Sequence, residues 1–555
     1  MAAIVSSKFR VVNANNFKED VANNSVYIAI GKPDVWSNTI SDTTDATTAD
    51  TPNDHLDDIG EARANMMGLK KIASTDISHV TNRVDWTSGN SYVEWDSNDA
   101  GIVDKHYYVL TNEFKVYKCI KAPTNVPSTQ QPTQTLTDPQ LESDGYMWKY
   151  MYTISVTDSE KFLTNQYMPV KTISLGAEAT VAVAQSAAGT DIVLKDVNPN
   201  ILVGMTVSGT GVGSNKKVAS ISGSKLVLSA ATTSAVAADA ILTFSFATNA
   251  DAEANLTEAD YNQYLNQVAS RDSSTAAGLE RIEVVNNGSN YSSVPTVTIT
   301  GDGTGATATA TLTSQQVTSI TVNTKGTNYT YADITITGGG GSEATARAVI
   351  SPREGHGVDP KTELGGFFMA LNVKLDGADG NNDITVGNDF RQIMLIKNPK
   401  DYNATPLAGT IATADTLKAM NKLDFTSSFS SGSNVTSFTI DEVITGGTSG
   451  AKAFVVETDN TTNSGQGLVF YTQNSKTGYG LFTDGETVTG GTSGTVGTLE
   501  GTLATSGSSL GDNFGTGDLP GEVDRMSGDI LFLENRLPIL RSSTQIEDIK
   551  VILEF

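Results

Sequence analysis

Alternation of apolar and polar residues is the main local signal along the chain, and it predicts β-strands. The clearest case is an aromatic face that alternates with its neighbours, formed by Tyr146, Trp148, Tyr150, Tyr152 and Ile154. Alternation recurs at 367–375 and 549–555, and further strands are predicted at 26–30, 114–120 and 391–396. The segment 549–555 ends the chain on Phe555, so we expect the carboxyl terminus to be a paired core strand.

Two segments carry helical signals instead. Residues 54–69 follow Pro52 and a candidate cap, Asn53, and place several apolar residues near one face. Thr257 and Asp260 have the spacing of a capping box, which predicts a helix that includes Tyr261. The chain is therefore predicted to be mainly β with helical excursions.

Composition divides the chain into segments. All four tryptophans lie in residues 1–175, whereas Gly, Thr, Ser, Ala and Val dominate from about Gly176. Segments rich in aromatic and large apolar residues recur later in the chain. We therefore predict a discontinuous β-sandwich core that is interrupted by small all-β modules. The modules are expected at loop positions, where an insertion costs little stability. The predicted core parts are residues 1–175, 353–427 and 511–555. The predicted insertions are a β module at 176–248, a helical linker at 249–277, and repeat β modules at 278–352 and 428–510.

Two internal repeats lie in these insertions. Gly288 and Tyr291 recur 38 residues later as Gly326 and Tyr329. The segment 442–450 returns 44 residues on at 486–494, with an identical Thr-Gly-Gly-Thr-Ser-Gly hexapeptide. Each repeat implies two copies of one β unit that buries its apolar face against a neighbour.

Charge and cysteine content narrow the function classes. The net charge is −25, from 62 acidic and 37 basic residues, which disfavours nucleic-acid and anionic membrane partners. Cys119 is the single cysteine, so an intrachain disulfide is impossible and assembly in a reducing host cytoplasm is expected. No signal peptide and no membrane helix is expected from the hydropathy pattern.

Candidate chemistry is sparse, and we expect no catalytic residue and no cofactor. The four histidines are far apart in sequence, and Gly301–Gly305 lies between strand-like runs with no following Gly-Lys-Ser/Thr, which favours a hairpin turn over a phosphate loop. Asp376, Asp379 and Asp383 offer the oxygen ligands that calcium prefers, but their spacing departs from that of an EF-hand loop. They are weak candidates for a metal site.

Short motifs in the predicted core resemble one family. They include Ala3–Arg10, Val26–Gly31, Arg83–Trp86, Gly145–Tyr150 and Gly528–Ile539, in the same order as in the family. The chain resembles the baseplate wedge proteins encoded by gene eight of T-even-type contractile-tailed phages, over residues 1–175, 358–425 and 520–555. The residues singled out as core or family positions are Phe9, Arg10, Tyr27, Trp36, Trp86, Tyr146, Trp148, Tyr150, Arg391, Glu534, Asn535, Arg536 and Pro538.

The resemblance implies a structural protein in the virion, a homodimer, and contacts with other baseplate wedge proteins and fibre-connecting proteins. For Asn535 and Arg536 it favours structural roles, such as a buried arginine with bidentate bonds, over a ligand role. Two alternatives stay open at this point. The inserted β modules could make the chain a host-surface or carbohydrate-binding adhesin, or a close carboxylate pair could make it a tail-associated glycan hydrolase.

Overall fold

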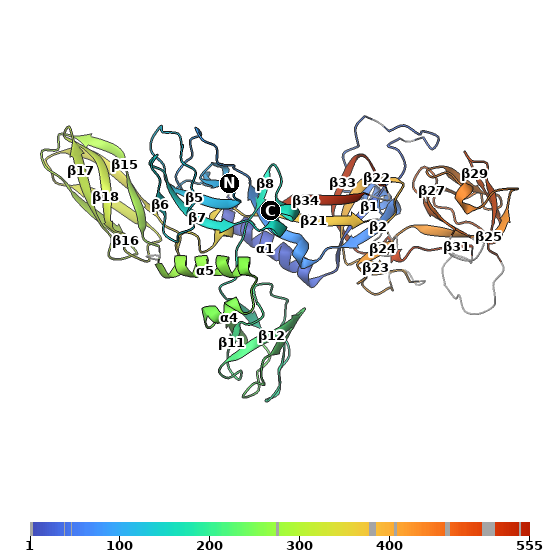
Figure 1. Ribbon diagram of the computed structural model, residues 1–555, viewed down its shortest axis with the longest axis horizontal. Helices are drawn as coiled ribbons and strands as arrows, with labels where there is room; N and C mark the ends of the chain where they lie inside the picture. Colours follow the sequence, from blue (N-terminus) through green and yellow to red (C-terminus); the bar gives the residue numbers. More distant parts are fainter. Residues whose placement is uncertain are drawn as a thin grey trace. The chain divides into compact units, whose positions relative to one another are not determined.

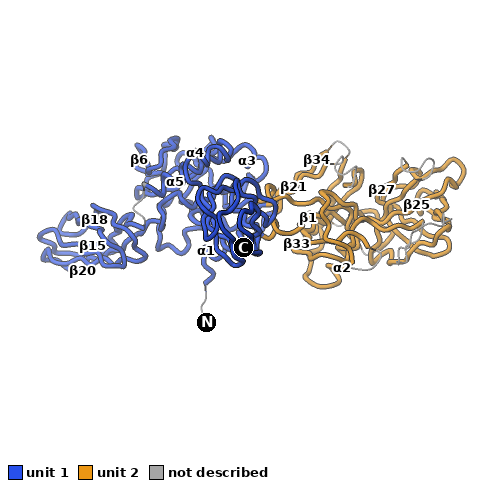
Figure 2. Tube along the Cα trace, turned by 90° about the horizontal axis from the view of Figure 1, so that it is seen from below, with its two compact units in different colours: residues 1–19, 78–370, 552–555 blue, residues 20–77, 371–551 orange. Residues whose placement is uncertain are grey.

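The structure is a computed structural model that describes residues 4–37, 39–45, 47–273, 277–376, 384–403, 408–460, 467–501, 517–542 and 545–555. Its strands greatly outnumber its helices, so the predicted mainly β class is confirmed (Figure 1). The chain forms two compact units, coloured separately in Figure 2. Unit 1 comprises residues 1–19, 78–370 and 552–555, and unit 2 comprises residues 20–77 and 371–551.

The aromatic part of unit 1 is built on a four-stranded antiparallel sheet ordered β4-β5-β7-β6. Its strands are β4 (Tyr108–Leu110), β5 (Lys115–Lys121), β6 (Gln140–Leu141) and β7 (Met147–Thr153). The predicted strand at 146–154 is therefore β7. Sequence alternation implied one buried face, but Lys149 and Met151 on the other face are buried too. Helix α5 (Glu258–Ser273) contributes to that burial, because Asn266 donates to the carbonyl of Met151.

Two further sheets of unit 1 lie within the predicted insertions. The first is ordered β10-β13-β12-β11-β14-β9 and contains β9 (Ala177–Thr180), β10 (Asp191–Val193), β11 (Thr206–Ser208), β12 (Lys216–Ser222), β13 (Lys225–Leu228) and β14 (Ile241–Ser245). The second is ordered β16-β19-β20-β15-β18-β17 and contains β15 (Leu279–Ser289), β16 (Thr296–Gly301), β17 (Thr307–Thr313), β18 (Gln316–Thr324), β19 (Ala332–Thr337) and β20 (Ser342–Ile350). Each sheet has its own buried apolar cluster.

The first sheet of unit 2 is ordered β24-β2-β1-β22-β33. Its strands are β1 (Val26–Gly31), β2 (Met66–Lys71), β22 (Asp389–Lys397), β24 (Thr416–Lys418) and β33 (Asp529–Leu540). All of the described neighbours in this sheet pair antiparallel. Strands β1 and β22 are buried almost throughout, as expected for the centre of a sheet, whereas β33 is an edge strand.

The second sheet of unit 2 is ordered β28-β27-β26-β29-β30-β25-β31, and an added β28–β25 pairing closes six of its strands into a ring. Its strands are β25 (Asn421–Phe429), β26 (Val443–Gly446), β27 (Lys452–Asp459), β28 (Gly467–Thr472), β29 (Thr487–Gly490), β30 (Val496–Leu499) and β31 (Asp518–Leu519). We call this segment, residues 421–519, the ring module. It is wider than the predicted insertion at 428–510.

A further sheet contains the carboxyl end. Its order is β34-β21-β3-β8, with β3 (Ile77–Asn82), β8 (Tyr167–Pro169), β21 (Phe368–Asp376) and β34 (Ile546–Glu554). The final strand is therefore paired at a sheet edge, and Ile549 and Val551 are buried as the alternation predicted. A short pair joins β23 (Lys400–Asp401) to β32 (Val523–Asp524).

The helices agree only partly with the sequence prediction. Helix α5 starts at its predicted capping box, in which Thr257 accepts a hydrogen bond from the backbone of Asp260. The predicted helix at 54–69 is shorter, because α2 ends at Ala64 and Met66 begins strand β2. Helix α1 was not predicted. The helices are α1 (Ser7–Asn23), α2 (Leu56–Ala64), α3 (Val156–Phe162), α4 (Asn249–Glu253), α5 and α6 (Pro360–Glu363), with 3₁₀ turns at Ser74–Asp76, Ile102–Asp104 and Val435–Ser437.

Candidate functional site

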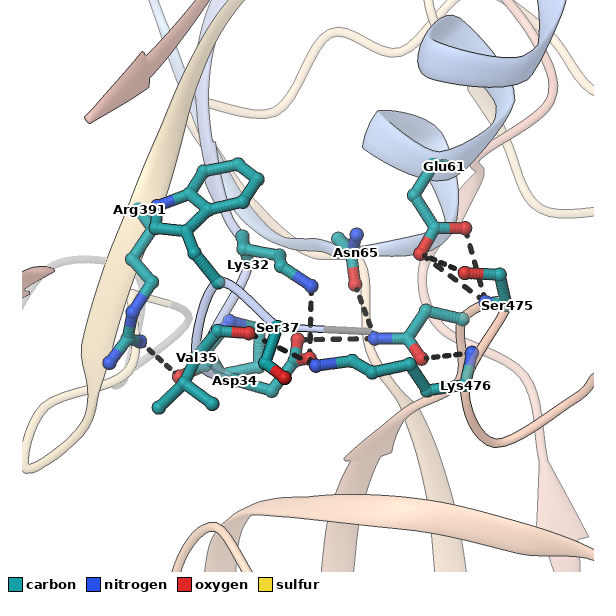
Figure 3. A network of polar contacts seen from close by, with 12 residues as sticks. Lys32, Asp34, Val35, Ser37, Glu61, Asn65, Arg391, Ser475 and Lys476 are labelled. Atoms are coloured by element: carbon teal, nitrogen blue, oxygen red, sulfur yellow. Dashed lines mark hydrogen bonds and ion pairs between the residues drawn. The ribbon is translucent and has the colours of Figure 1, made fainter. Parts of the chain in front are cut away.

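A buried polar network in unit 2 joins the end of β1 to the ring module (Figure 3). Lys32 and Lys476 both contact the carboxylate of Asp34, Lys32 at 2.9 Å. Asn474 donates to Asp34 at 3.1 Å and to Asn65 at 3.2 Å. Burial lowers the pKa of Lys32, and the charge of Asp34 opposes that shift. The ring module is thus fixed to the first sheet by buried charge-assisted bonds.

Backbone geometry at the end of β1 positions this network. Lys32 adopts φ 63°, a left-handed conformation, and its backbone N–H donates to the carbonyl of Asn65 at 3.0 Å. A Cβ at the preceding residue, Gly31, would lie 2.7 Å from that carbonyl oxygen. Glycine is therefore required at this strand end, since any side chain would push the Asn65 backbone away.

Arg391 of β22 fixes the loop that follows β1. Its guanidinium makes a bidentate pair with Asp45, with Nε–Oδ1 at 2.8 Å and Nη2–Oδ2 at 2.7 Å, and it also donates to the carbonyl of Pro33. Burial raises the pKa of Asp45, but hydrogen bonds from Arg391 and Trp36 outweigh that effect and leave it lowered. Trp36 itself donates from Nε1 to the carbonyl of Arg536 at 2.8 Å.

A cavity of about 520 Å³ lies beside this network in unit 2. We call it the polar cleft, and its principal lining residues are Lys32, Trp36, Asn65, Gln392, Lys476 and Asn535. The acidic residues Asp50, Asp58 and Glu61 also line it. Glu61 accepts from Ser475 (Figure 3). It also accepts from the hydroxyl of Tyr479. The cleft is a preformed, mostly polar site of a volume that suits a small ligand.

Several predicted motif residues of unit 1 have packing roles. Tyr146 and Trp148 are buried and stack with their ring centres 5.8 Å apart, while Tyr150 is half-buried. Trp86 donates to the hydroxyl of Ser128 at 3.1 Å. These aromatic residues line one apolar cluster.

The amino-terminal motif contains one partly buried residue, Arg10, and one exposed residue, Phe9. The guanidinium of Arg10 lies 3.5 Å from the ring centre of Phe367 and is bonded to the backbone of Phe555 and to Glu554. Phe9, in contrast, lies on the surface with 55% of its area exposed, so the expectation of a core position is not met there.

The motif residues of unit 2 also divide into buried and exposed positions. Tyr27 of β1 is fully buried and donates to the carbonyl of Ala414 at 2.7 Å. Pro538 is exposed, and Glu534 and Arg536 form a weak, half-exposed pair at 3.8 Å. The buried bidentate arginine is therefore Arg391, and Arg536 does not have that role.

The second repeat forms a reciprocal arrangement that the sequence did not reveal. Glu442 of the first copy accepts from the backbone N–H groups of Thr492 and Ser493 in the second copy, both at 2.8 Å. Glu486 of the second copy accepts in the same way from Thr448 and Ser449 of the first, at 2.7 and 2.8 Å. Each of the two identical hexapeptide loops is thus capped by the glutamate of the other copy. The two identical hexapeptides in the sequence indicated a repeat, but they did not indicate that each loop pairs with the glutamate of the other copy.

A buried ionic cluster in unit 1 was also missed. Lys118 of β5 donates to Glu363 at 2.7 Å and lies 2.9 Å from Nδ1 of His356. Burial raises the pKa of Glu363, but the charge of Lys118 and a bond from His356 hold it at about 2. Glu280, in the repeat module, lies 3.5 Å from Nε2 of His356. The cluster therefore links this module to the aromatic sheet.

The weak metal candidates gain no support. Asp376 ends β21, and Asp379 and Asp383 lie outside the described residues. Within the part of the chain that the structure describes, no group of three His, Cys, Asp or Glu side chains is arranged to hold a metal ion. No helix among the same residues is long and apolar enough to cross a membrane.

Comparison with known proteins adds one match. Residues 3–137, about a quarter of the chain, match the family model described as Bacteriophage T4, Gp8. The matched segment contains α1, β1, α2 and the first strands of the aromatic sheet, including Phe9, Arg10, Tyr27, Trp36 and Trp86. No curated protein sequence matches the chain significantly.

Proposed function

We propose, from the match of residues 3–137 to the family model described as Bacteriophage T4, Gp8, that the whole chain is a structural subunit of a phage baseplate wedge. Its role in the virion tail is structural, and we infer that it acts by binding other proteins and turns over no substrate. The family match is the observation that carries this proposal. Assembly in the host cytoplasm accords with the single, buried Cys119.

An apolar stripe at the amino terminus supports a docking role within the matched segment. Ile4, Val5, Phe9 and Val12 are 83, 64, 55 and 43% exposed, whereas Val11 and Ala14 of helix α1 are buried. Phe9 and Val12 are three residues apart in α1 and share one face, and Ile4 and Val5 lie just before the helix. Burying such side chains contributes roughly 1.5–3 kcal/mol each. We propose that this stripe binds a neighbouring wedge protein or a fibre-connecting protein.

Strand β33 is our proposed dimer surface. It is twelve residues long, ends its sheet, and exposes Leu531, Leu537 and Leu540 at 45, 48 and 62%. A long apolar edge strand of this kind is a ready surface for association, and a twofold axis would place the same strand on both sides of the interface.

Light scattering on the purified chain tests this dimer surface. We expect a dimer at micromolar concentration, a monomer for Leu537→Lys, and an unchanged dimer for the control Leu136→Lys, whose side chain is 58% exposed in unit 1. A wild-type monomer that stays monomeric with wedge partners present would contradict the homodimer. Equal effects of the two substitutions would remove β33 from the interface.

A further inference from the structure

Two adjoining cavities in unit 1 form a groove along helix α1. Their volumes are about 760 and 170 Å³, and they adjoin because they share the lining residues Asn15, Thr172, Ile173, Ser174, Asn200 and Lys361. Helix α1 contributes side chains at a spacing of three or four residues, so one face of the helix lines the groove: Lys8, Val12, Asn15 and Lys18. We call the two cavities together the α1 groove. The larger one has the volume of a site that encloses a ligand.

The α1 groove is rich in basic side chains, although the chain as a whole has a net charge of −25. The larger cavity is lined by Lys8, Arg271, Arg353 and Lys361, and the smaller cavity adds Lys18. Arg271 is paired with Asp272 at 2.9 Å. Among the residues that the structure describes, the other four basic residues form no ion pair.

The acidic residues of the groove do not supply the missing negative charge. Asp359 caps helix α6, and Asp260 is paired with Lys171 at 2.5 Å. Glu354 is exposed to water. Burial raises the pKa of Glu19, which disfavours its charged form. Positive charge therefore remains uncompensated in the groove.

Two of the unpaired lysines, Lys18 and Lys361, interact unfavourably with each other. Burial, followed by the charges of Lys361 and Lys171, lowers the pKa of Lys18 to about 8. Burial also lowers the pKa of Lys361, although nearby carboxylates oppose that shift. The ammonium group of Lys361 donates to Oδ1 of Asn15 at 3.2 Å, which is a neutral acceptor. An anionic group in the groove would offset both the burial and the repulsion.

Apolar side chains lie beside these cations. Val12, Ile173 and Leu175 line the larger cavity. Val12 also belongs to the exposed amino-terminal stripe, so the groove continues that surface. A phosphate ion or a nucleic-acid backbone has no apolar group to place there, and the negative charge of the chain repels nucleic acid. A protein segment that combines carboxylates with apolar side chains matches both parts of the lining.

We propose that the α1 groove binds an acidic segment of a neighbouring protein. Its carboxylates face the four unpaired basic residues, and its apolar side chains pack against Val12 and Ile173. Charge complementarity of this kind selects the partner and fixes its register. The inference rests on the proposed assembly role and adds the chemistry of one partner segment.

Fluorescence anisotropy on the full-length protein tests the proposal, with short labelled peptides in which glutamate alternates with valine, leucine or phenylalanine. We expect saturable binding of at least one peptide, and binding weaker by about tenfold or more when glutamine replaces its glutamates. The double variant Lys8→Glu/Arg353→Glu changes two exposed side chains and should weaken binding by about as much. Lys452→Glu, at an exposed position in unit 2, is the matched control and should leave binding unchanged.

The comparison of glutamate and glutamine peptides needs no variant, so it remains decisive if the double variant fails to fold. The proposal is overturned if no glutamate peptide binds, if the glutamine peptide binds equally well, or if the double variant and Lys452→Glu bind alike. Displacement of the peptide by an equal concentration of inorganic phosphate or of an oligonucleotide would also overturn it, because the groove would then be a general anion site. Absence of peptide binding by a chain that is present in the baseplate removes only the groove. Peptide binding by a chain that is absent from the baseplate contradicts the assembly role and keeps the groove.

Discussion

The reciprocal capping of the second repeat makes a prediction that distinguishes it from ordinary loop packing. Replacing Glu442 with alanine should release the loop at 491–494, which lies in the other copy, and leave the loop at 447–450 closed. Replacing Glu486 should do the reverse. Both glutamates are 4% exposed, so the released N–H groups have few other partners.

The expected magnitude follows from the bonds that are lost. Glu442 accepts from the N–H groups of Thr439, Thr492 and Ser493 and from the Ser493 hydroxyl, at 2.7–2.8 Å. A hydrogen bond to a charged acceptor contributes about 1.5–3 kcal/mol. Because water will reach some of the donors after truncation, we expect a local loss of about 3–5 kcal/mol rather than the full sum.

Hydrogen exchange followed by mass spectrometry measures this effect segment by segment. In Glu442→Ala, the amides of Thr492 and Ser493 should exchange at least about a hundredfold faster, while those of Thr448 and Ser449 keep their protection. Glu253→Ala, an exposed glutamate of unit 1, is the control. Loss of protection in the loop of the mutated copy, or in neither loop, would refute the reciprocal arrangement.

Three further predictions concern unit 2 and the chain end. Arg391→Lys can keep only one of the two bonds to Asp45, so denaturant unfolding should show a loss of about 1.5–3 kcal/mol. Burial raises the pKa of Asp518 to about 7 despite a bond from the Tyr471 hydroxyl. The folded state therefore holds a proton that the unfolded state releases near pH 3.8, so stability should fall between about pH 4 and 7, and Asp518→Asn should flatten that slope in pH-dependent melts. Deletion of residues 549–555 removes two thirds of β34, and loss of a cooperative circular-dichroism melt is expected, whereas an unchanged melt would contradict the core role of this strand.

Sequence alone predicted the elements whose apolar residues repeat with a single clear period. The strand at 146–154 and the capped helix α5 are of this kind. The helix expected at 54–69 was too long because Met66 and Met67 fit either period, and a strand partner for Met66 decides the outcome. Helix α1 was missed because its apolar residues occupy two faces, one buried around Val11 and one exposed around Phe9.

The polar cleft could not be predicted, for a different reason. Its residues come from four distant segments, around Lys32, Asn65, Gln392 and Lys476, and each is an ordinary polar residue in its own sequence context. Only the pairing of β1 with β2 and β22 brings the first three together. Asn474 lies inside the segment 428–510, which was predicted to be a separable insertion. No sequence feature indicated that this residue is fully buried and hydrogen-bonded to Asn65.

An electron-microscopy map of the intact phage baseplate tests the central claim most directly. The account predicts that both units fit density within each wedge, in paired copies, with the stripe of Ile4, Val5, Phe9 and Val12 covered by another protein. A baseplate map in which every wedge is complete without density for this chain would contradict it.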